Sequence, residues 1–524
     1  MPWPITISLL CLGTPALGAI WFTAPETVPW GSAPVLPPSF VSYSIELAYL
    51  PDYAGNTSHP NTFSENLLEQ LRRFSGDDAR PTIRVGGSSQ DRVTYNPDLK
   101  EARELQGNGD IPSSFEIGPS FFESLNTFKD TRFIYGLNMK KSVQSADAYD
   151  NMLKTVAVAC RALVNDNILA WSYGNEPNLY GFDWVSEEYT ALWLEASRGI
   201  RAVLEDECPE LVEDGVFGFL TPSVSSLKSG HVNIPDILEA GINDDNAVFF
   251  LGAHNYMGDS EDDINRQAKL MNHSKIAETI QRHVNLLEKF AADYASIPYG
   301  ISETNSLFKQ GKAGVSNTFG AALWTLDFRL HAAARNISRL NFHMGRDYRY
   351  AAWQPVETDK TAIGTKAPYY GNLATAAVLG NLGNDEVQVV ELEYYKDGGT
   401  ESAYGIYHGG DLAKVVVLNM AEYNFTKSGN AMDEELNTKK RGSHNFSIKV
   451  PESFKDRSAT VRRLEAPGAD SITGITWDGY TFNYEVDNGV GRRLENVTYG
   501  ETIVVADAKV TVRIPHSSAV VLEF

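Results

Sequence analysis

Short apolar segments and amphipathic segments alternate eight times between residues 40 and 380. The apolar segments cover residues 40–47, 81–88, 132–138, 168–171, 216–222, 247–254, 298–303 and 337–343. The amphipathic segments cover residues 64–74, 121–128, 146–164, 187–205, 234–241, 275–295, 319–335 and 370–379. Apolar strands that alternate with amphipathic helices are typical of a parallel sheet covered by helices. Eight such units predict an α/β fold, a (β/α)8 TIM barrel over residues 40–380.

The pattern changes after residue 380, where apolar residues recur at every second position between Gly-, Asp- and Asn-rich turns. The segments with this pattern include residues 386–392, 413–419, 446–450 and 510–514. This spacing predicts a C-terminal antiparallel β-sandwich over residues 381–524. Residues 20–39, which are Pro-rich and partly apolar, are expected to form an N-terminal segment that adds an edge strand to the sandwich. A chain of 524 residues also exceeds what one core normally supports, which favours two domains.

The N-terminus carries an apolar run from Ile5 to Leu12, followed by small residues at positions 16–19. This pattern indicates a secretory signal peptide over residues 1–19, although a basic n-region is missing. The alternative is a plain apolar first strand. Six Asn-x-Ser/Thr sequons fit secretion and are candidate glycosylation sites: Asn56, Asn272, Asn336, Asn424, Asn445 and Asn496. We therefore expect a secreted, extracellular protein.

Outside the predicted signal peptide the chain has two cysteines, Cys160 and Cys208. They are a candidate disulfide in an oxidising compartment, and two free thiols on helices are the alternative. The spacing of Cys and His indicates no metal site, and no cofactor is predicted. The formal net charge of −22 argues against nucleic acid and anionic membranes as partners. The sequence leaves the oligomeric state open.

Two glutamates stand at the ends of predicted barrel strands. Asn175 and Glu176 follow the strand that leads through Trp171, and Pro177 stops that strand from continuing in a central sheet. Glu303 ends the seventh strand. Strand ends at the carboxyl face of a barrel are where catalytic residues collect, and two carboxyls there can hydrolyse a glycoside. For Glu176 alone, the alternative is a residue that caps the next helix.

With these residues in place, the chain resembles the large clan of retaining (β/α)8 glycosidases. Within that clan it resembles glycoside hydrolase family 79, the β-glucuronidases and heparanases. The residues that carry the family resemblance stand at strand ends or follow them: Gly86-Gly87-Ser88, His254-Asn255-Tyr256, Ser302-Glu303-Thr304-Asn305-Ser306, and Tyr348 and Tyr350 after His343. The resemblance covers the barrel and, through the trailing sandwich, the whole mature chain.

The resemblance implies that Glu176 is the acid/base and Glu303 the nucleophile. It implies these substrate-binding residues: Glu46, Gly87, Ser88, Asn175, His254, Tyr256, Gly311 and Tyr350. Asn175 is expected to bond the sugar 2-hydroxyl, and Tyr256 to bond Glu303 and keep it ionised. Retention of configuration requires a carboxyl separation of about 5–5.5 Å. The alternatives are a structural role for Glu46 and satisfied core histidines at positions 254 and 343.

A glucuronic acid substrate needs hydrogen-bond donors for its carboxylate. In the family these are main-chain amides of the loop after the nucleophile strand and a tyrosine after strand eight. In this chain the loop is residues 308–311 and the tyrosine is Tyr350. Gly311 is the only glycine left in that loop, and Lys309 is either a compensating charge or a solvated loop lysine.

These residues predict a secreted retaining exo-β-glucuronidase that removes terminal glucuronic acid, with or without a 4-O-methyl group, from glycans. The expected partner is a glycan or glycoconjugate that contains glucuronic acid. We favour exo action over heparanase-like endo action because the acidic surface is expected to lack the basic rims that a sulfated chain requires, and the chain shows no excised linker segment. The alternatives are a related retaining β-glycosidase on neutral sugars and a carbohydrate-binding protein that has lost activity.

Overall fold

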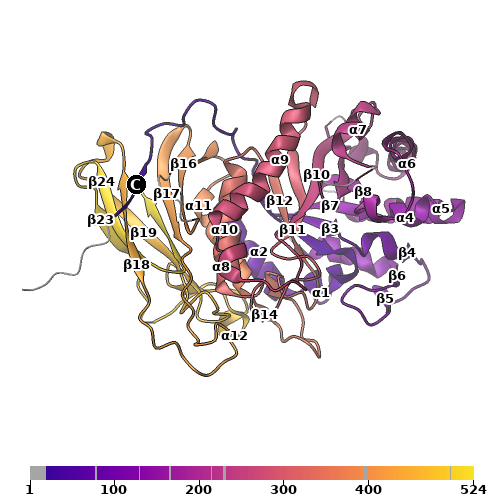
Figure 1. The fold of residues 1–524 in the computed structure, drawn as a ribbon. Coiled ribbons are helices and arrows are strands. Elements are labelled where there is room, and N and C mark those ends of the chain that lie inside the picture. The colour runs from indigo at the N-terminus through magenta and orange to yellow at the C-terminus, as the bar shows by residue number, and fades with distance from the viewer. Residues whose placement is uncertain are drawn as a thin grey trace, which may run out of the picture.

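The chain folds into a closed parallel barrel followed by a β-sandwich, as a computed structural model shows (Figure 1). The structure describes residues 19–76, 79–128, 130–163, 167–213, 215–227, 230, 232–294, 296–393, 399–495 and 497–524. Most of the predicted signal peptide and the sequon at Asn496 lie outside these residues. The predicted α/β barrel with a C-terminal antiparallel β-domain is confirmed.

Eight parallel strands close the barrel in the order β10-β11-β12-β2-β3-β7-β8-β9. They are β2 (Val41–Glu46), β3 (Thr82–Gly86), β7 (Arg132–Leu137), β8 (Ile168–Tyr173), β9 (Phe219–Val224), β10 (Val248–Tyr256), β11 (Tyr299–Asn305) and β12 (Arg339–Met344). Their cyclic order follows the sequence, so all eight carboxyl ends meet at one end of the barrel.

Helices connect the strands and cover the barrel. The longer ones are α2 (Thr62–Ser75), α5 (Ala146–Leu163), α6 (Ser186–Glu207), α7 (Ile234–Glu239), α9 (His273–Tyr294), α10 (Phe319–Ala333) and α11 (Ala367–Leu379). Short helices α1 (Leu50–Ala54), α3 (Ser124–Thr127), α4 (Met139–Ser142) and α8 (Arg266–Lys269) lie in the connections. Asn61, Asn138, Asn233 and Asn265 start four of these helices, and each amide oxygen accepts a backbone N–H in the first turn.

The connection after β3 contains a small sheet, in a stretch for which the sequence predicted no strand. Its strands are β4 (Val93–Tyr95), β5 (Arg103–Gln106) and β6 (Ser114–Ile117), in the order β4-β6-β5. Each has three or four residues, which is too short for an alternating pattern to stand out from a loop. Between β5 and β6, Ile111 and Ser113 line cavities at the barrel mouth.

The C-terminal domain contains a nine-stranded sheet and a three-stranded sheet. The large sheet contains β15 (Val387–Glu391), β16 (Glu401–His408), β17 (Asp411–Asn419), β19 (Ser458–Glu465), β20 (Thr476–Trp477), β21 (Tyr480–Thr481), β22 (Arg492–Arg493), β23 (Glu501–Val504) and β25 (Ser518–Glu523). The small sheet contains β1 (Ile20–Thr23), β18 (Ser443–Lys449) and β24 (Lys509–Pro515), with β1 pairing with β18 at one edge. Two further short elements are the β13–β14 pair (Trp353–Gln354, Gly364–Thr365) and α12 (Tyr484–Asp487).

In the middle of the large sheet both faces are buried. On β17, Val415 and Val417 pack into the core between the two sheets, whereas Val416 and Leu418 pack into the core shared with the barrel. Because successive side chains of a strand point to opposite faces, one short apolar run serves two cores. The sandwich is therefore joined to the barrel along an apolar interface.

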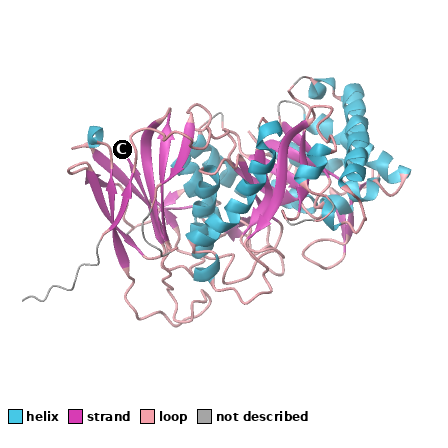
Figure 2. Ribbon diagram, turned by 45° about the horizontal axis from the view of Figure 1, so that its top comes forward, coloured by secondary structure: helices cyan, strands magenta, loops and turns pink. Residues whose placement is uncertain are grey.

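Helices α10 and α11 lie between the barrel strands and the large sheet (Figure 2). Every residue of both helices is buried. A helix that is apolar on all sides is typical of such a position between two layers. Asp327, Arg329 and His331 are the titratable exceptions on α10. The Arg329 guanidinium donates to the carbonyl oxygen of Ser42 (3.0 Å) and stacks 4.0 Å from the centroid of the Phe342 ring.

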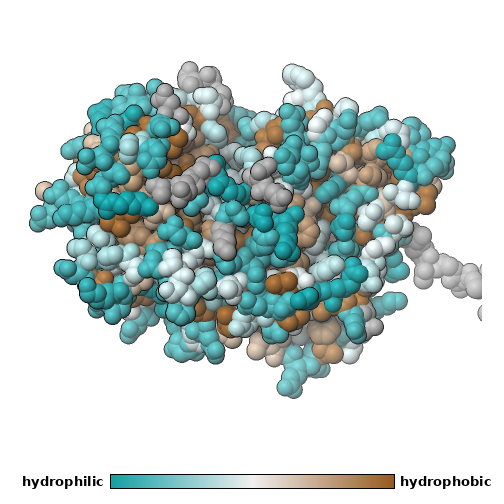
Figure 3. All heavy atoms as spheres, turned by 180° about the vertical axis from the view of Figure 1, so that it is seen from behind, coloured by the Kyte–Doolittle hydropathy of each residue, from teal (hydrophilic) through white to brown (hydrophobic). Residues whose placement is uncertain are grey.

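Cys160 at the end of α5 and Cys208 after α6 form a disulfide with a Cα–Cα distance of 6.2 Å. No helix in the described part of the chain is long and apolar enough to cross a membrane. On the face seen in Figure 3, hydrophilic residues predominate, and hydrophobic ones form small patches between them. Polar side chains thus cover most of this side of the molecule.

Candidate active site

Glu176 and Glu303 converge at the carboxyl end of the barrel. One oxygen of each carboxylate and Nδ1 of His254 all lie within 4.8 Å of one another. The two glutamates line one cavity of about 570 Å³ together with Glu46, Ser88, His254, Tyr256, Phe308, Lys309, Gln310, His343, Tyr348 and Tyr350. The sequence thus placed a pair of carboxyls in one cavity from strand ends that are more than a hundred residues apart.

Glu303 is held as a buried carboxylate. Arg84 Nη1 donates to its Oε2 at 2.9 Å, and the Tyr256 hydroxyl donates to its Oε1 at 2.8 Å. Burial alone would raise the pKa of this carboxyl, but attraction to His343, His254 and Arg84 holds that pKa well below its usual range. Glu303 is therefore ionised over the whole physiological pH range, as a nucleophile must be.

Glu176 has a different setting. Its side chain is 21% exposed, compared with 7% for Glu303, and its Oε1 lies 2.9 Å from His254 Nδ1. Its backbone is left-handed (φ 52°, ψ 52°), and its N–H donates to the carbonyl of Ser223 at 3.0 Å. A left-handed non-glycine residue is strained, and such strain concentrates at functional sites. The side chain makes no capping bond to the 3-10 helix that follows, which counts against the role of helix cap.

A buried network that the sequence did not reveal holds the strand-four motif. Arg84 is fully buried, and its Nη2 donates to Asn175 Oδ1 at 2.7 Å while its Nη1 bonds Glu303. Asp91 accepts from the Asn175 N–H (2.9 Å) and from the Tyr180 hydroxyl (2.6 Å). Burial raises the pKa of Asp91 to about 6, against the four donors that bond it. An arginine inside an otherwise apolar predicted strand was the one sequence signal for this network.

Glu46 is enclosed by donors on the opposite side of the mouth. The backbone N–H of Ser89 donates to Glu46 Oε2 at 2.9 Å, and the Ser89 hydroxyl bonds the same oxygen. His343 Nε2 and the Tyr348 hydroxyl each lie 3.3 Å from Glu46 Oε1. Ser88 lines the cavity, but its neighbour Ser89 binds Glu46. Which of two adjacent serines turns inward depends on the turn after β3, and the sequence does not specify that turn.

Gly87 allows the backbone of this turn to lie close to the Glu46 carboxyl and the His343 ring. Its φ is +73°, and a Cβ at this position would lie 2.7 Å from the Glu46 carboxyl and 2.7 Å from the His343 ring. Burial alone would lower the pKa of His343, but Glu303 and Glu46 raise it. His343 and His254 are both buried, and each bonds a carboxylate of the mouth.

The loop after β11 has an unusual backbone. Lys309, Gln310 and Gly311 have φ values of 57°, 62° and 79°, three successive left-handed residues. Arg349 contacts the carbonyl oxygens of all three: its N–H donates to Gln310 (2.8 Å), its Nε to Gly311 (3.1 Å) and its Nη2 to Lys309 (3.3 Å). The N–H groups of residues 309–311 donate to no acceptor in the described part of the chain. The carbonyls of these residues are thus bonded to Arg349, and Lys309 and Gln310 line the cavity.

The side chains around this loop complete the pocket. Lys309 Nζ pairs with Asp259 (3.0 Å) and Glu261 (2.8 Å), so its charge is already matched. The rings of Tyr256 and Tyr350 lie 6.2 Å apart between centroids. A Cβ on Gly311 would lie 3.0 Å from the Tyr350 ring and 2.8 Å from Ser316. The remaining glycine of the loop therefore occupies a position that a larger residue would crowd.

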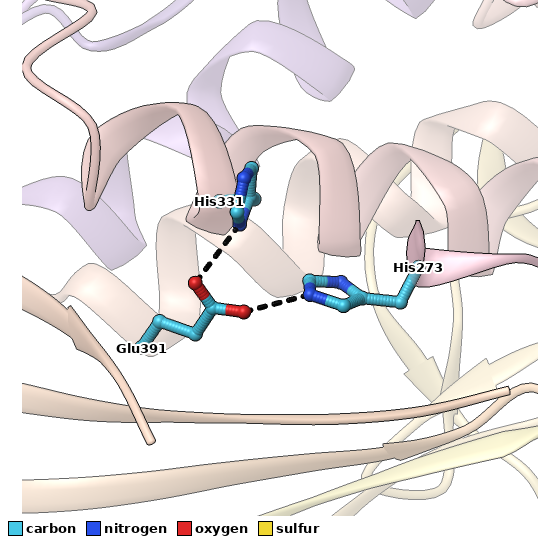
Figure 4. A group of neighbouring side chains, drawn as sticks. All are labelled: His273, His331 and Glu391. Carbon is cyan, nitrogen blue, oxygen red and sulfur yellow. Dashed lines mark hydrogen bonds and ion pairs between the residues drawn. The ribbon is translucent and has the colours of Figure 1, made fainter. Parts of the chain in front are cut away.

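A second cluster of similar side chains lies at the junction of the barrel and the sandwich (Figure 4). His273 opens α9, His331 lies on α10 and Glu391 ends β15. His273 Nε2 lies 2.7 Å from Glu391 Oε1, and His331 Nδ1 lies 3.4 Å from Glu391 Oε2. The donor types of either cluster suit a divalent metal, but Arg335 Nη2 lies 2.5 Å from Glu391 and Arg84 lies 2.9 Å from Glu303. A guanidinium beside the carboxylate disfavours a second cation at both places.

Sequence comparison places the chain among known proteins. The profile of the glycosyl hydrolase family 79 C-terminal beta domain matches residues 403–521. A β-glucuronidase of Neurospora crassa is 39% identical over 512 residues, which cover 92% of this chain and 90% of that protein. A β-glucuronidase of Aspergillus niger is 40% identical over 506 residues, which cover 93% of this chain and 91% of that protein.

Structural comparison agrees on the fold. A 4-O-α-L-rhamnosyl-β-D-glucuronidase from Fusarium oxysporum superposes with a TM-score of 0.74 at 23% identity, covering 96% of this chain and 100% of that one. A family 51 α-L-arabinofuranosidase from Bifidobacterium longum superposes with a TM-score of 0.61 at 13% identity, covering 96% and 99%. At these identities the likeness shows the shared barrel and sandwich architecture.

Proposed function

The chain belongs to the β-glucuronidases of glycoside hydrolase family 79, and from this premise we propose that it is a secreted, retaining exo-enzyme. In this proposal it removes terminal glucuronic acid, with or without a 4-O-methyl group, from glycans by double displacement. The observation that carries the mechanism is the approach of the Glu176 and Glu303 carboxylates to within 4.8 Å. Retaining glycosidases hold their carboxyl groups about 5–5.5 Å apart, whereas inverting enzymes need about 6.5–9.5 Å to admit a water molecule.

In the first step a Glu303 oxygen attacks the anomeric carbon while the glycosidic bond breaks. Glu176 gives its proton to the departing oxygen, so the leaving group departs as a neutral alcohol and a glycosyl ester forms on Glu303. We propose that Asn175, which is held by Arg84 and by Asp91 and directly precedes Glu176, bonds the sugar 2-hydroxyl. That contact strengthens as charge develops on the ring in the transition state.

In the second step the roles reverse. Glu303 is now an uncharged ester, and the Glu176 carboxylate takes a proton from water as that water attacks the anomeric carbon. The Glu303 carboxylate leaves, and glucuronic acid is released in its original configuration. The greater exposure of Glu176 suits a residue that must meet both the leaving group and water.

In this proposal, neighbouring side chains set the charge state of Glu303 and the orientation of Glu176. The Tyr256 hydroxyl and the Arg84 guanidinium bond Glu303 and favour its ionised form. His254 orients Glu176 through the contact at 2.9 Å. Glu46 and Ser88 line the same cavity and are proposed to bond hydroxyl groups of the bound sugar.

We assign recognition of the substrate carboxylate to the amides of residues 309–311 together with the Tyr350 hydroxyl. Three N–H groups without a protein acceptor form a small positive cradle, which suits an anion. Lys309 is not part of this cradle, because its ammonium pairs with Asp259 and Glu261. Arg349 acts through the loop, since it binds the three carbonyls and thereby aims the amides.

The glycone end of the cavity is bridged, which supports exo action. Arg349 Nη1 pairs with Asp110 Oδ2 at 3.1 Å, and Lys360 Nζ pairs with Asp110 Oδ1 at 3.0 Å. Asp110 precedes Ile111, which lines the cavity, so this bridge joins the carboxylate loop to the opposite wall. A long polymer threaded through the site would have to break these ion pairs.

Two features support passage through an oxidising compartment. The Cys160–Cys208 disulfide joins two helices of the barrel, and such bonds persist in secreted proteins. Asn56, Asn336 and Asn445 are exposed, as glycosylation requires. Asn272 and Asn424 are half-buried, and the amide oxygen of Asn424 accepts a bond from Arg266. We propose the first three as the used sequons.

The test compares aryl β-glucuronide with aryl β-glucoside and β-xyloside, and follows the anomer of the released sugar by NMR. We expect a strong preference for the glucuronide and β-glucuronic acid as the first product. Preference for a neutral glycoside would overturn the role of residues 309–311. If α-glucuronic acid appeared first, the double displacement would be wrong.

A further inference from the structure

A second cavity adjoins the one that holds both glutamates. It has a volume of about 540 Å³ and is lined by Ser88, Asp91, Arg92, Ser113, Lys140, Lys141, Gln144, Asn175, Glu176, Leu179 and Tyr180. Ser88, Glu176 and Leu179 line both cavities, so the two spaces meet at the proposed acid. Of these two cavities, Glu303 and residues 308–310 line the first and not the second.

This division matches the two sides of a glycosidic bond. The nucleophile must reach the anomeric carbon from within the glycone pocket, whereas the acid must reach the bridging oxygen on the leaving-group side. Accepting the retaining mechanism proposed above, we infer that the second cavity is the leaving-group subsite and that it binds a hydroxyl-rich sugar ring. A volume of about 540 Å³ is large enough for a sugar unit of this kind.

The lining offers both surfaces that a sugar ring needs. Leu179 is 62% exposed beside Glu176, and an apolar side chain suits the C–H face of a pyranose. Lys140 Nζ lies 5.5 Å from the centroid of the Tyr180 ring and has no ion-pair partner in the described part of the chain. Arg92 donates through Nη1 to the Pro112 carbonyl at 2.7 Å. Lys140 and Arg92 are thus cationic donors beside the acid in a chain with a net charge of −22.

Lys141 is excluded from this role by its contacts. Its Nζ donates to the Arg92 carbonyl (2.9 Å) and to Thr94 Oγ1 (2.9 Å). Burial lowers its pKa, against the attraction of Glu116. Of two adjacent lysines on α4, one therefore supports the wall and the other is available to the ligand.

Asp91 links the subsite to the acid. Its Oδ1 accepts the N–H groups of Met139 (3.0 Å) and Lys140 (3.1 Å) at the start of α4. Its Oδ2 accepts the N–H of Asn175, the residue before Glu176, at 2.9 Å. One buried carboxyl thereby sets the distance between Lys140 and the proton donor, so a ring bound at Lys140 presents its bridging oxygen to Glu176.

The experiment compares kcat/KM on an aryl β-glucuronide and on a β-glucuronyl disaccharide whose leaving group is a hexose. For Lys140→Ala we expect a loss of about 10-fold on the disaccharide and less than about twofold on the aryl substrate, because a bond to a charged donor is lost only in the first case. Lys154→Ala is the matched control, since Lys154 is an exposed lysine on α5 away from both cavities. Arg92→Ala provides a second variant with the same expected pattern.

A second measurement tests the same subsite with an added acceptor sugar. A hexose added as acceptor should intercept the glycosyl-enzyme in the wild type and yield disaccharide, and Lys140→Ala should reduce that yield several-fold relative to hydrolysis. Equal losses on both substrates, or no loss on either with unchanged acceptor yield, would overturn the subsite. A wild type that is inactive on the aryl glucuronide would overturn the proposed function itself.

Discussion

Two clusters of histidine and glutamate in this molecule look alike and differ in what they can do. At the barrel mouth Glu176, His254 and Glu303 bring their reactive atoms within 4.8 Å, and at the junction with the sandwich His273, His331 and Glu391 do the same. All three residues of the first cluster line the cavity of about 570 Å³ at the barrel mouth, and Glu176 also lines the second cavity. The comparison teaches that residue type and proximity do not make a catalytic site.

In the junction cluster, both ring nitrogens of His273 already have a carboxylate partner. Asp327 is fully buried and accepts from His273 Nδ1 (2.9 Å), the Ser402 hydroxyl (2.6 Å) and the Tyr404 hydroxyl (2.6 Å). Burial alone would lower the pKa of His273, but Asp327 and Glu391 raise it to about 10. An imidazolium that bridges two carboxylates has no free atom, so this cluster holds α9, α10 and the sandwich together. At the mouth, by contrast, Glu176 keeps part of its carboxyl exposed.

The largest expected difference in activity between the two clusters follows from replacing one glutamate of each by glutamine. Glu303→Gln should lower kcat by about 10⁵-fold or more, because no glycosyl ester can form. Glu391→Gln, the same change at the junction, should leave kcat on an aryl glucuronide within about threefold and instead lower the free energy of unfolding. Steady-state kinetics and urea unfolding of both variants measure this; a Glu391→Gln variant with lost activity but unchanged stability would break the comparison.

Glu176→Gln tests the acid in the mouth cluster. We expect a loss of about 10³-fold on a substrate with a poor leaving group and a much smaller loss on a dinitrophenyl glucuronide, since general acid catalysis matters least for a good leaving group. Added azide should restore turnover of the activated substrate and yield β-glucuronyl azide. If both substrates lose the same factor and azide has no effect, Glu176 is not the acid/base.

The junction cluster should show its role in the pH dependence of stability. The pKa of His273 is about 10 in the folded protein against 6.5 ordinarily, so its contribution is full below about pH 6.5 and is lost as the pH rises through 10. The slope should reach about 1.4 kcal/mol per pH unit at most. Glu391 acts oppositely: its pKa is lowered, so its contribution is present above the ordinary value of 4.5 and is lost as the pH falls.

Urea unfolding of His273→Asn at pH 6, 8 and 10 checks this. The variant should be less stable than the wild type by about 3 kcal/mol at pH 6, and the difference should shrink toward pH 10. The side chains of His331, Asp327, Arg335 and Tyr404 face the same cluster and are retained in the variant. A constant difference across the pH range would show that His273 acts by packing alone.

The smallest effect is expected from a hydroxyl that donates to a carboxylate in each cluster. Tyr256→Phe removes a donor from Glu303 and should cost about 10-fold in kcat/KM, while the acidic limb of the pH profile moves to higher pH because the bond lowers the pKa of Glu303. Tyr404→Phe removes the corresponding donor from Asp327 and should change stability without moving that limb. A shifted limb in Tyr404→Phe would show that the clusters are coupled.

The barrel could be predicted because its strands are local patterns. Each predicted strand overlaps an observed one, and β8 and β11 place Glu176 and Glu303 at one end. The residues that position this site could not be predicted in the same way. Arg84 bonds Glu303 across 219 positions, and Arg349 reaches residues 309–311 from the next loop, so only the closed barrel brings them together.

The sequence also could not show which of two adjacent residues of the same type makes a given contact. Ser89 rather than Ser88 binds Glu46, and Lys140 rather than Lys141 remains free, because the turn after β3 and the first turn of α4 decide which side chain points inward. A shift of one position reverses such an assignment without changing the composition of either motif.

By itself, the sequence determined the order of the strands and helices, the ends where the glutamates stand and the domain that follows them. These depend on periodicity and on residues close together in the chain. Only the tertiary structure decided that Glu303 is an enclosed carboxylate, that three loop amides have no acceptor in the described part of the chain and that two cavities meet at Glu176. The physical reason is that charge state, exposure and free hydrogen-bonding groups depend on everything packed around a residue. At the mouth of a barrel, the residues around a side chain come from strands that are distant in the sequence and meet only when all eight strands close.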